Sequence, residues 1–289
     1  MRDLVITGAS GFLGASLVEA ARSLYPDARV HAIASPRYGG IDLTRPDAFE
    51  RLRSEIRIPH PEGAALIHAA AIVEWDESER ALSGNAAMAF NAARWARDTG
   101  VGFCVFVSGV NVYRSVPKIE AADSYVEPPT LYGVGKIAAE HVWRILLPEQ
   151  QRATVRLAGI WGWQSRPTMF WNRILQAAVH GSAAPLTVRR GASFRNYISA
   201  PESAECLLRI AANKTHGLFL GAGRDTVDTR SFVSAVQDLP LSRLEVEWQD
   251  DGGCDQSLFT PSPELLPYLK PFPEVLANLW QNRPKQEAC

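Results

Sequence analysis

Short apolar runs alternate with longer amphipathic segments along the first 160 residues of the chain. The apolar runs cover residues 4–8, 29–35, 64–70, 102–109 and 153–160. The helical patterns between them cover residues 11–24, 45–57 and 81–99 and the segment that begins near residue 131. The run "FCVFV" does not alternate between apolar and polar residues, as expected for a strand that is covered on both faces. This order predicts an α/β fold with a Rossmann-type, doubly wound parallel sheet.

After residue 160 the alternation loosens, and the stretch "WGWQSRPTMFW" concentrates aromatic residues. The later run "GLFLGAG" again resembles a strand of the main sheet. We therefore predict a dinucleotide-binding Rossmann domain in residues 1–160, with a later return near 196–221. Residues 161–289 are predicted to form a smaller carboxy-terminal, substrate-binding lobe.

Composition narrows the choice of partners and compartment. The 289 residues are 46% hydrophobic and carry a formal net charge of -1, so no global field attracts nucleic acid or an anionic membrane. No apolar run approaches the roughly 20 residues that a membrane-spanning helix needs. The four cysteines form no pair or His-containing group at metal-ligand spacing, so we expect no metal and a reduced, cytoplasmic setting. The expected partner is a small molecule, with a homodimer left open.

The stretch "VITGASGFLGASL" places Gly8, Gly11 and Gly14 between the first predicted strand and the first predicted helix. Glycines at this turn let the backbone approach a pyrophosphate, and the following helix offers free N–H groups and a positive dipole end. A glycine triplet alone is a weak signal. At this junction it predicts a dinucleotide-binding site.

The helical segment "LYGVGKIAAEH" carries Tyr132 and Lys136 four residues apart. On a helix these positions lie on the same face, so the ammonium can approach the phenol. A tyrosine normally has a pKa near ~10, and an adjacent cation lowers it by favouring the phenolate. Tyr132 could then exchange a proton with a substrate carbonyl or alcohol. The alternative is a surface Tyr and Lys without a joint role.

Four further motifs, together with YGVGK, extend the pattern over nearly the whole chain. "HAAA" at 68–71 is expected to end a fourth strand, and YGVGK is expected to lie on the helix after a fifth. The other motifs are "NAAMAFNAARWA" at 85–96, "RLAGIWG" at 156–162 and "RNYISAPESAE" at 195–205. With the glycine loop, they resemble the extended short-chain dehydrogenase/reductase family, the NAD(P)-dependent epimerases and dehydratases. The resemblance implies that Tyr132 is the proton donor or acceptor. It also implies that Lys136 binds the nicotinamide ribose and lowers the pKa of Tyr132.

The end of the second strand indicates which dinucleotide binds. It carries Ser35 and Arg37 and no carboxylate, which favours NADP(H) over NAD(H), because a 2′-phosphate needs a cation and a hydroxyl. Asp42 resembles the family residue that receives the adenine amino group, although it or Thr44 could instead cap the next helix. The predicted cofactor-binding residues are Gly8, Ser10, Gly11, Phe12, Leu13, Gly14, Ser35, Arg37, Asp42, Leu43, Ala69, Ala70, Ala71, Tyr132 and Lys136.

No Asp or Glu occurs between Glu149 and Glu202, but seven arginines do. They are Arg152, Arg156, Arg166, Arg173, Arg189, Arg190 and Arg195. Arginine forks suit phosphate and carboxylate, so an anionic substrate such as a nucleotide-linked sugar is one interpretation, with Arg195 as the predicted substrate-binding arginine. The other is that several of them pair with acids elsewhere. The aromatic residues Trp161, Trp163, Phe170 and Trp171 could stack a ring, but such spacing is more typical of a core.

The chain departs from the resembled family after the strand at 102–109. Where the family usually reads Ser-Ser-x-x-Val-Tyr-Gly, this chain reads "SGVNVYR", so Ser108 is kept and Gly109 lacks the hydroxyl that orients the substrate carbonyl. Gly159 stands where sugar-nucleotide members often carry Asn. We predict that Ser108 is the catalytic replacement donor and that Asn111 contacts the substrate. Asn111 and Thr130 are the other candidate donors.

These features together predict an NADP(H)-dependent oxidoreductase that interconverts a carbonyl and an alcohol. Positions 109–111 lack the Thr-Asp-Glu of the resembled 4,6-dehydratases, which argues against elimination chemistry. A redox-neutral, NAD-dependent sugar-nucleotide epimerase is the first alternative. A non-catalytic NADP-binding sensor is the second, because Gly109 lacks the family hydroxyl. The retained Tyr132 and Lys136 argue for an enzyme.

Overall fold

The computed structural model describes residues 1–73, 79–163, 169–189, 193–249 and 256–283. At its centre is a six-stranded sheet in the order β11-β6-β4-β3-β1-β2, and all its neighbouring strands are parallel. The strands are β1 (Asp3–Thr7), β2 (Arg29–Ile33), β3 (Ala65–His68), β4 (Phe103–Gly109), β6 (Arg152–Leu157) and β11 (Gly217–Gly221). The predicted Rossmann-type sheet is confirmed.

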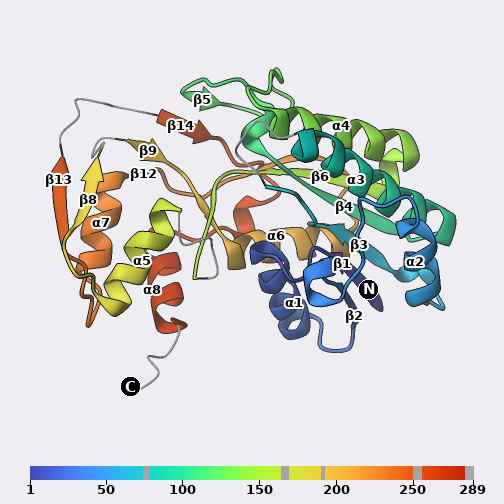
Figure 1. The fold of residues 1–289 in the computed structure, drawn as a ribbon, viewed down its shortest axis with the longest axis horizontal. Coiled ribbons are helices and arrows are strands. Elements are labelled where there is room, and N and C mark those ends of the chain that lie inside the picture. The colour runs from blue at the N-terminus through green and yellow to red at the C-terminus, as the bar shows by residue number, and fades with distance from the viewer. Residues whose placement is uncertain (74–78, 164–168, 190–192, 250–255, 284–289) are drawn as a thin grey trace.

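Helices cover both faces of this sheet (Figure 1). One face carries α1 (Phe12–Leu24) and α6 (Ala200–Asn213), and the other carries α2 (Ala48–Glu55), α3 (Glu79–Thr99) and α4 (Leu131–Leu146). Along β1, Leu4 and Ile6 join the core under α1 and α6, whereas Val5 joins the core under α2 and α3. Successive side chains point to opposite faces of a strand, so a continuous apolar run serves both cores.

The order of the strands places a crevice between β1 and β3. From β1 the chain moves outward to β2 and then returns to the other side of β1 to form β3. The loops that follow β1 and β3 therefore diverge at the carboxyl edge of the sheet, where ligands bind in open α/β folds. Gly8 and Ala69, the first residues after these two strands, lie at this edge.

The chain does not add a strand between β2 and β3, so two expectations were wrong. "HAAA" ends the third strand along the chain, and YGVGK follows the fourth strand of the main sheet and the short β5. Residues 34–64 instead form two 3₁₀ turns, η1 (Pro36–Tyr38) and η2 (Pro61–Gly63), with α2 between them. This segment folds back on itself, so that the backbone at Gly40 lies against the Ala34 carbonyl, where a Cβ would collide with it.

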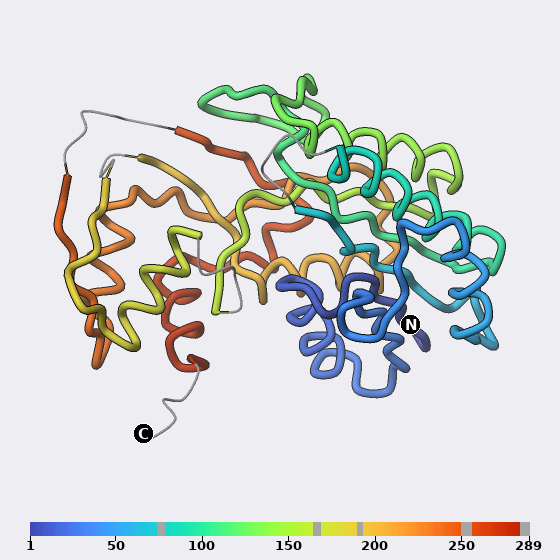
Figure 2. The backbone as a smooth tube through the Cα atoms, in the orientation of Figure 1, coloured from blue at the N-terminus to red at the C-terminus, as the bar shows by residue number. Residues whose placement is uncertain are grey.

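A second body, the carboxy-terminal lobe, lies beside the carboxyl edge of the sheet (Figure 1). Its helices are α5 (Phe170–His180), α7 (Thr229–Gln237) and α8 (Phe272–Gln281). Two small sheets have two strands each: β8 (Leu186–Arg189) pairs with β13 (Val246–Gln249), and β7 (Ile160–Trp161) pairs with β10 (Ile198–Ser199). A third sheet has four strands in the order β12 (Val227–Asp228), β9 (Phe194–Arg195), β14 (Gln256–Phe259) and β5 (Lys118–Ile119). Further 3₁₀ turns are η3 (Val110–Val112), η4 (Glu149–Gln151) and η5 (Leu266–Tyr268). The chain crosses between the two bodies repeatedly (Figure 2).

The described residues do not have what membrane-spanning helices, metal sites and reactive cysteines require. None of their helices has the length and apolar character needed to cross a bilayer. No three side chains of His, Cys, Asp or Glu in these ranges gather to hold a metal ion. Cys104 and Cys206 are free and buried, and burial raises the pKa of both thiols, which makes them poor nucleophiles.

Candidate active site

The glycine loop forms a cradle in which side chains have no room. Gly8 follows β1 with φ at +71°, and a Cβ there would lie 2.6 Å from the backbone N of Ala70. A Cβ at Gly14 would lie 2.7 Å from the carbonyl carbon of Gly8. Gly11 is the N-cap of α1 and makes no side-chain hydrogen bond to the first turn. A helix N-terminus without a side-chain cap, behind a close-packed loop, fits a dinucleotide pyrophosphate.

The segment after β2 lies against this loop and carries Ser35 and Arg37, the residues predicted to favour NADP(H). The Ser35 N–H donates to Ser10 Oγ at 3.0 Å, and the Ala9 N–H donates to the Ile33 carbonyl at 3.1 Å. Arg37 is exposed on η1 and has no ion-pair or hydrogen-bond partner within the ranges that the structure describes. Its guanidinium can therefore receive an anion beside the glycine loop.

Asp42 does not cap a helix. Its Oδ1 accepts from the Thr44 N–H at 3.1 Å and from the Thr44 hydroxyl at 2.7 Å, and these bonds hold the pKa of the carboxyl below its usual value. Helix α2 begins at Ala48 with Asp47 at the N-cap position, so the proposed capping roles of Asp42 and Thr44 were wrong. The neighbouring Leu43 is buried, and its carbonyl accepts from Asn91 of α3 at 3.0 Å. The predicted contact of Asp42 and Leu43 with adenine stays a prediction.

The loop after β3 is held in place by His68 and Thr7. The Thr7 hydroxyl is hydrogen-bonded to His68 Nδ1 at 2.7 Å and also accepts from the Ala70 N–H at 3.4 Å. His68 is stacked against Phe106 and Trp143. Burial, with a smaller effect of the Lys136 charge, lowers the pKa of His68 to about 3, so its imidazole is neutral. His68 thus positions the loop carrying the predicted cofactor residues Ala69, Ala70 and Ala71.

Helix α4 places Tyr132 and Lys136 beside the end of β4. Thr130 caps this helix by accepting from the Gly133 N–H at 3.2 Å. Lys136 is buried, donates to the Val107 carbonyl at 2.8 Å, and has its Nζ 6.0 Å from the centre of the Tyr132 ring. Burial lowers the pKa of Lys136 to about 8, although the Glu140 carboxylate acts to raise it. A buried ammonium this close to a phenol favours the phenolate.

The end of β4 presents two of the three candidate donors. Ser108 Oγ is buried and has no hydrogen-bond partner within the described residues. Buried hydroxyls in folded proteins are almost always paired, so this one needs an explanation. Asn111 is half-buried on η3, and its Oδ1 would lie 3.3 Å from a Cβ built on Gly109. The Asn111 amide therefore occupies part of the space that a side chain at residue 109 would take.

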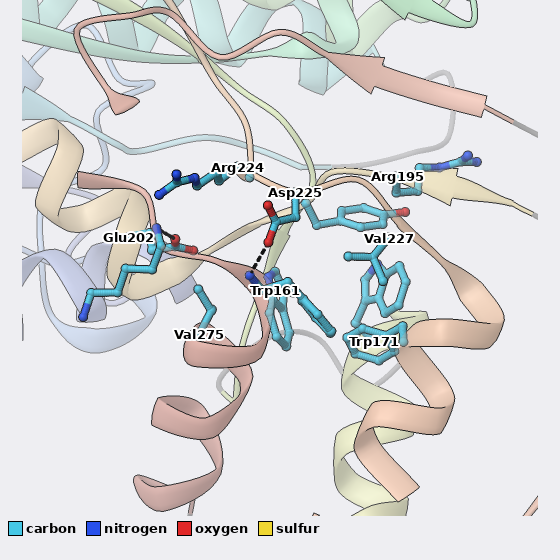
Figure 3. Close-up of a pocket in the computed structure, with 13 residues that line it drawn as sticks. Trp161, Trp171, Arg195, Glu202, Arg224, Asp225, Val227 and Val275 are labelled. Carbon is cyan, nitrogen blue, oxygen red and sulfur yellow. Dashed lines mark hydrogen bonds between the residues drawn. The ribbon is translucent and has the colours of Figure 1, made fainter. Parts of the chain in front are cut away.

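The lobe contains a pocket with a mixed-charge rim (Figure 3). Arg195, Asp225 and Arg224 lie on the rim, above the aromatic side chains Trp161 and Trp171 (Figure 3). The Asp225 carboxylate accepts from the Phe272 N–H at 2.7 Å. Arg195 lines this pocket and the predicted catalytic residues Tyr132, Lys136 and Ser108 do not.

The structure describes four of the six remaining arginines, and these four divide into two groups. Arg156 is buried and makes a two-pronged pair with Glu140, at 3.0 and 2.7 Å, and Arg152 donates to the Leu147 carbonyl. Both are therefore structural. Arg173 and Arg189 are exposed, and Arg189 bonds to Gln249. Arg166 and Arg190 lie outside the described residues. An anion-binding role thus stays open for Arg195 and does not extend to the whole set.

The aromatic residues of the lobe are mainly core. Trp161 and Trp171 are buried with Phe232, whose ring centre lies 4.0 Å from that of Trp171. Trp163 and Phe170 pack against the same cluster. The Tyr197 ring fills the space that a side chain at Gly159 would need, so an Asn cannot enter there without a rearrangement.

Comparison with known proteins agrees with this geometry. The model of the NAD dependent epimerase/dehydratase family matches residues 4–219, about three quarters of the chain. The chain belongs to this family. It is therefore a member of a family of nicotinamide-dependent enzymes, as the sequence predicted. No curated protein sequence matches it.

Solved structures share the fold at low sequence identity. A dTDP-4-dehydrorhamnose reductase from Bacillus anthracis str. Ames in complex with NADP is 18% identical, with a TM-score of 0.77 over 98% of this chain and 100% of that chain. MoeE5 in complex with UDP-glucose and NAD is 20% identical, with a TM-score of 0.76 over 96% and 97%. The UDP-glucose 4-epimerase of Thermus thermophilus in complex with NAD is 19% identical, with a TM-score of 0.71 over 94% of both chains.

Several residues that shape the family site were not found from the sequence. Asn85 accepts from the Ile72 N–H at 3.0 Å and donates to the Ile72 carbonyl at 3.1 Å, which fixes the chain beyond Ala71. Arg224 and Asp225 reach the lobe pocket from the loop after β11. Their signal was a charged pair directly after a predicted strand, at the edge of the sheet where ligands bind.

Proposed function

We propose that this chain is an NADP(H)-dependent oxidoreductase that interconverts a carbonyl and an alcohol. The observation that carries the proposal is the buried Lys136 ammonium next to Tyr132, at the sheet edge where the glycine loop opens. Burial strengthens the field of an ammonium at a nearby phenol, because little water screens it. A buried lysine with a lowered pKa beside a cofactor cradle is typical of a catalytic site.

The residues of the chain then have separate tasks. A nicotinamide dinucleotide, with its pyrophosphate held by the glycine loop and its nicotinamide ribose by Lys136, would supply or accept the hydride. In reduction, Tyr132 donates its phenolic proton to the substrate oxygen, and in oxidation it takes the proton back. The Lys136 charge stabilises the phenolate between these events. Ser108 is proposed to donate a hydrogen bond to the same substrate oxygen, which would give its buried hydroxyl a partner.

The preference for NADP(H) is supported by Arg37 and Ser35. Arg37 is exposed and unpaired among the described residues, and Ser35 lies next to Ser10 of the glycine loop. A guanidinium can bind a 2′-phosphate through two parallel N–H groups, whereas it gains little from a ribose hydroxyl. The structurally similar reductase from B. anthracis is in complex with NADP.

An anionic substrate, such as a nucleotide-linked sugar, is supported by Arg195 and by what the similar structures bind or act on. Arg195 lies on the rim of the lobe pocket, in the part of the chain that contains no acid between Glu149 and Glu202. Two of the similar structures are a dTDP-4-dehydrorhamnose reductase and a protein in complex with UDP-glucose. The lobe is therefore proposed to bind the anionic part and Tyr132 to face the carbonyl.

Fluorescence titration with NADPH and NADH tests the cofactor assignment. The native protein should bind NADPH more tightly. Arg37→Ala should lose about tenfold in NADPH affinity, the effect of one charge-assisted contact, and keep its NADH affinity. Arg29→Ala is the control, because Arg29 is an exposed arginine at the other end of β2. NADPH affinity unchanged by Arg37→Ala would contradict the role of Arg37.

Turnover tests the reaction. NADPH oxidation should be screened with nucleotide-linked ketosugars and with simple aldehydes and ketones, beside Tyr132→Phe. A substrate that the native protein reduces and Tyr132→Phe does not would support the oxidoreductase.

A redox-neutral epimerase is the second candidate, because one similar structure is a UDP-glucose 4-epimerase with NAD. Such an enzyme returns the hydride to its own substrate and needs no external reductant. Equal or tighter binding of NADH, together with conversion of a nucleotide sugar without net NADPH consumption, would favour it over the oxidoreductase.

A further inference from the structure

A groove lies between the carboxyl ends of α2 and α3, away from the predicted catalytic residues. It has a volume of about 590 Å³ and is lined by residues of both helices and of the segment after α2, including Phe49, Arg53, Ile56, Arg57, Trp95 and Thr99. In a parallel α/β sheet, a helix ends near the amino end of the next strand. The groove therefore lies toward the edge opposite the glycine loop and Tyr132, and it is a separate feature.

The groove carries an excess of positive charge. Arg53 and Arg57 are exposed and have no ion-pair partner within the described residues. The nearby carboxylate of Asp98 is shared by Arg94, at 3.8 Å, and Arg97, at 2.8 Å. Asp98 is the one carboxylate among the described residues that line the groove, and it is already paired with Arg94 and Arg97, so Arg53 and Arg57 have no counter-charge there. This local imbalance attracts anions.

A second observation comes from Trp95. Its side chain lines the groove and is 1% exposed, and its indole N–H has no acceptor among the described residues. Trp N–H groups usually find a partner when they are buried. Phe49, Ile56 and Ile58 add apolar surface to the same wall. The groove therefore combines excess positive charge with an apolar wall, and an unpaired indole N–H is buried within that wall.

We propose that the α2–α3 groove binds a small phosphate monoester that carries a flat apolar group. Arginine forks match the oxygens of a phosphate, and the volume lies within the range of small-molecule sites. The apolar group would lie against the wall formed by Phe49 and Ile56, and Arg53 and Arg57 would hold the phosphate. This site does not depend on the proposed redox function.

Calorimetric titration of the full-length protein with phenyl phosphate tests the site. Saturating NADPH is present, so that the probe cannot occupy the glycine loop. We expect saturable binding with a Kd of millimolar or below, weaker binding of inorganic phosphate, and none of phenol. Arg53→Ala/Arg57→Ala should weaken binding of phenyl phosphate at least about tenfold, because both charge-assisted contacts are lost. Arg243→Ala, an exposed arginine of the lobe, is the control and should bind as the native protein does.

Two outcomes would overturn the proposal. The first is that phenyl phosphate does not bind at up to millimolar concentrations. The second is that it binds equally to the native protein and to Arg53→Ala/Arg57→Ala, which would place it elsewhere. Trp95→Phe keeps a ring at the wall and removes the N–H. It should weaken binding several-fold, with folding checked by circular dichroism and NADPH titration.

Discussion

At the scale of the residue, the buried ammonium of Lys136 opposes folding near neutral pH. In the unfolded chain the lysine holds its proton up to a pKa of about 10.5, whereas in the folded protein burial lowers the pKa to about 8. Between these values the unfolded state binds more protons, so stability increases as the pH rises through this window. The difference corresponds to ~3 kcal/mol. The catalytic role that we propose for Lys136 and the stability of the fold therefore place opposite demands on this residue.

Lys136→Met removes this dependence. Between pH 8 and pH 9.5 the free energy of unfolding of the native protein should rise by ~2 kcal/mol relative to the variant, because the native lysine loses its proton in this range. Urea unfolding of both proteins without cofactor at each pH measures the difference. If the two proteins change in parallel with pH, the ammonium of Lys136 is not destabilised by the fold.

The donor at the end of β4 is a second question at this scale. Ser108→Ala should lower kcat by about 10²-fold, the usual effect of losing one hydrogen bond to a developing oxyanion, once a substrate is known. Asn111→Ala and Thr130→Val are measured beside it. Native kcat in Ser108→Ala, with a collapse in Asn111→Ala or Thr130→Val, would assign the role to that residue. Asn111 is included because its half-buried amide lies close to the position that a side chain at residue 109 would occupy.

At the scale of the element, α4 must approach α3 closely for Tyr132 and Lys136 to reach the end of β4. A Cβ at Gly135 of α4 would lie 2.7 Å from the Ala81 carbonyl oxygen and 2.9 Å from that of Leu82, both on α3. The two helices are therefore in contact at Gly135, one residue before Lys136. The buried pair of Arg156 with Glu140 links the same helix to β6.

Gly135→Ala should destabilise the protein by ~1–3 kcal/mol, because backbone atoms cannot move aside without separating the helices. It should also reduce turnover by displacing Lys136. Gly63→Ala is the matched control. No atom lies within 4 Å of a Cβ there, so the variant should be neutral or up to ~1 kcal/mol more stable. Thermal unfolding and turnover of both variants measure the effects, and equal stability of the two would show that α3 and α4 need no close contact.

At the scale of the whole molecule, the sheet and the lobe have separate cores. Trp143 belongs to the core between the sheet and α3, where it stacks on His68 beneath the loop with Ala70. Trp280 belongs to the lobe core and donates to the Pro240 carbonyl at 3.0 Å. This arrangement supports the division of function that we propose, with cofactor binding in the sheet domain and substrate binding in the lobe.

Replacing each indole tests that division. Trp143→Ala and Trp280→Ala should each cost ~3–5 kcal/mol of stability, since both remove a buried ring. Trp143→Ala should also weaken NADPH binding, because the loop positioned by His68 loses its support. Trp280→Ala should leave NADPH affinity nearly unchanged, as expected for a distant and independent site. A loss of NADPH affinity in Trp280→Ala as large as in Trp143→Ala would mean that the two bodies do not act separately.

Features that depend on neighbours along the chain could be predicted from the sequence. The alternation of strands and helices followed from short continuous apolar runs and from the amphipathic segments between them. The glycine loop followed from its place between a strand and a helix, and the Tyr132–Lys136 pair from one helical turn. Each of these relations is local, because backbone geometry alone brings the residues together. The family assignment rests on the same kind of information, since motifs occur in a set order.

Only the tertiary structure decided which long-range partner each polar side chain has. Arg156 is paired with Glu140 and not available to a substrate, Asp42 is bonded to Thr44, and Lys136 is buried deeply enough to lower its pKa. The aromatic residues of the lobe became core because α5, α7 and α8 close around them. Burial and pairing depend on residues far apart in sequence, and every arginine or tryptophan has the same chemistry until its surroundings are known.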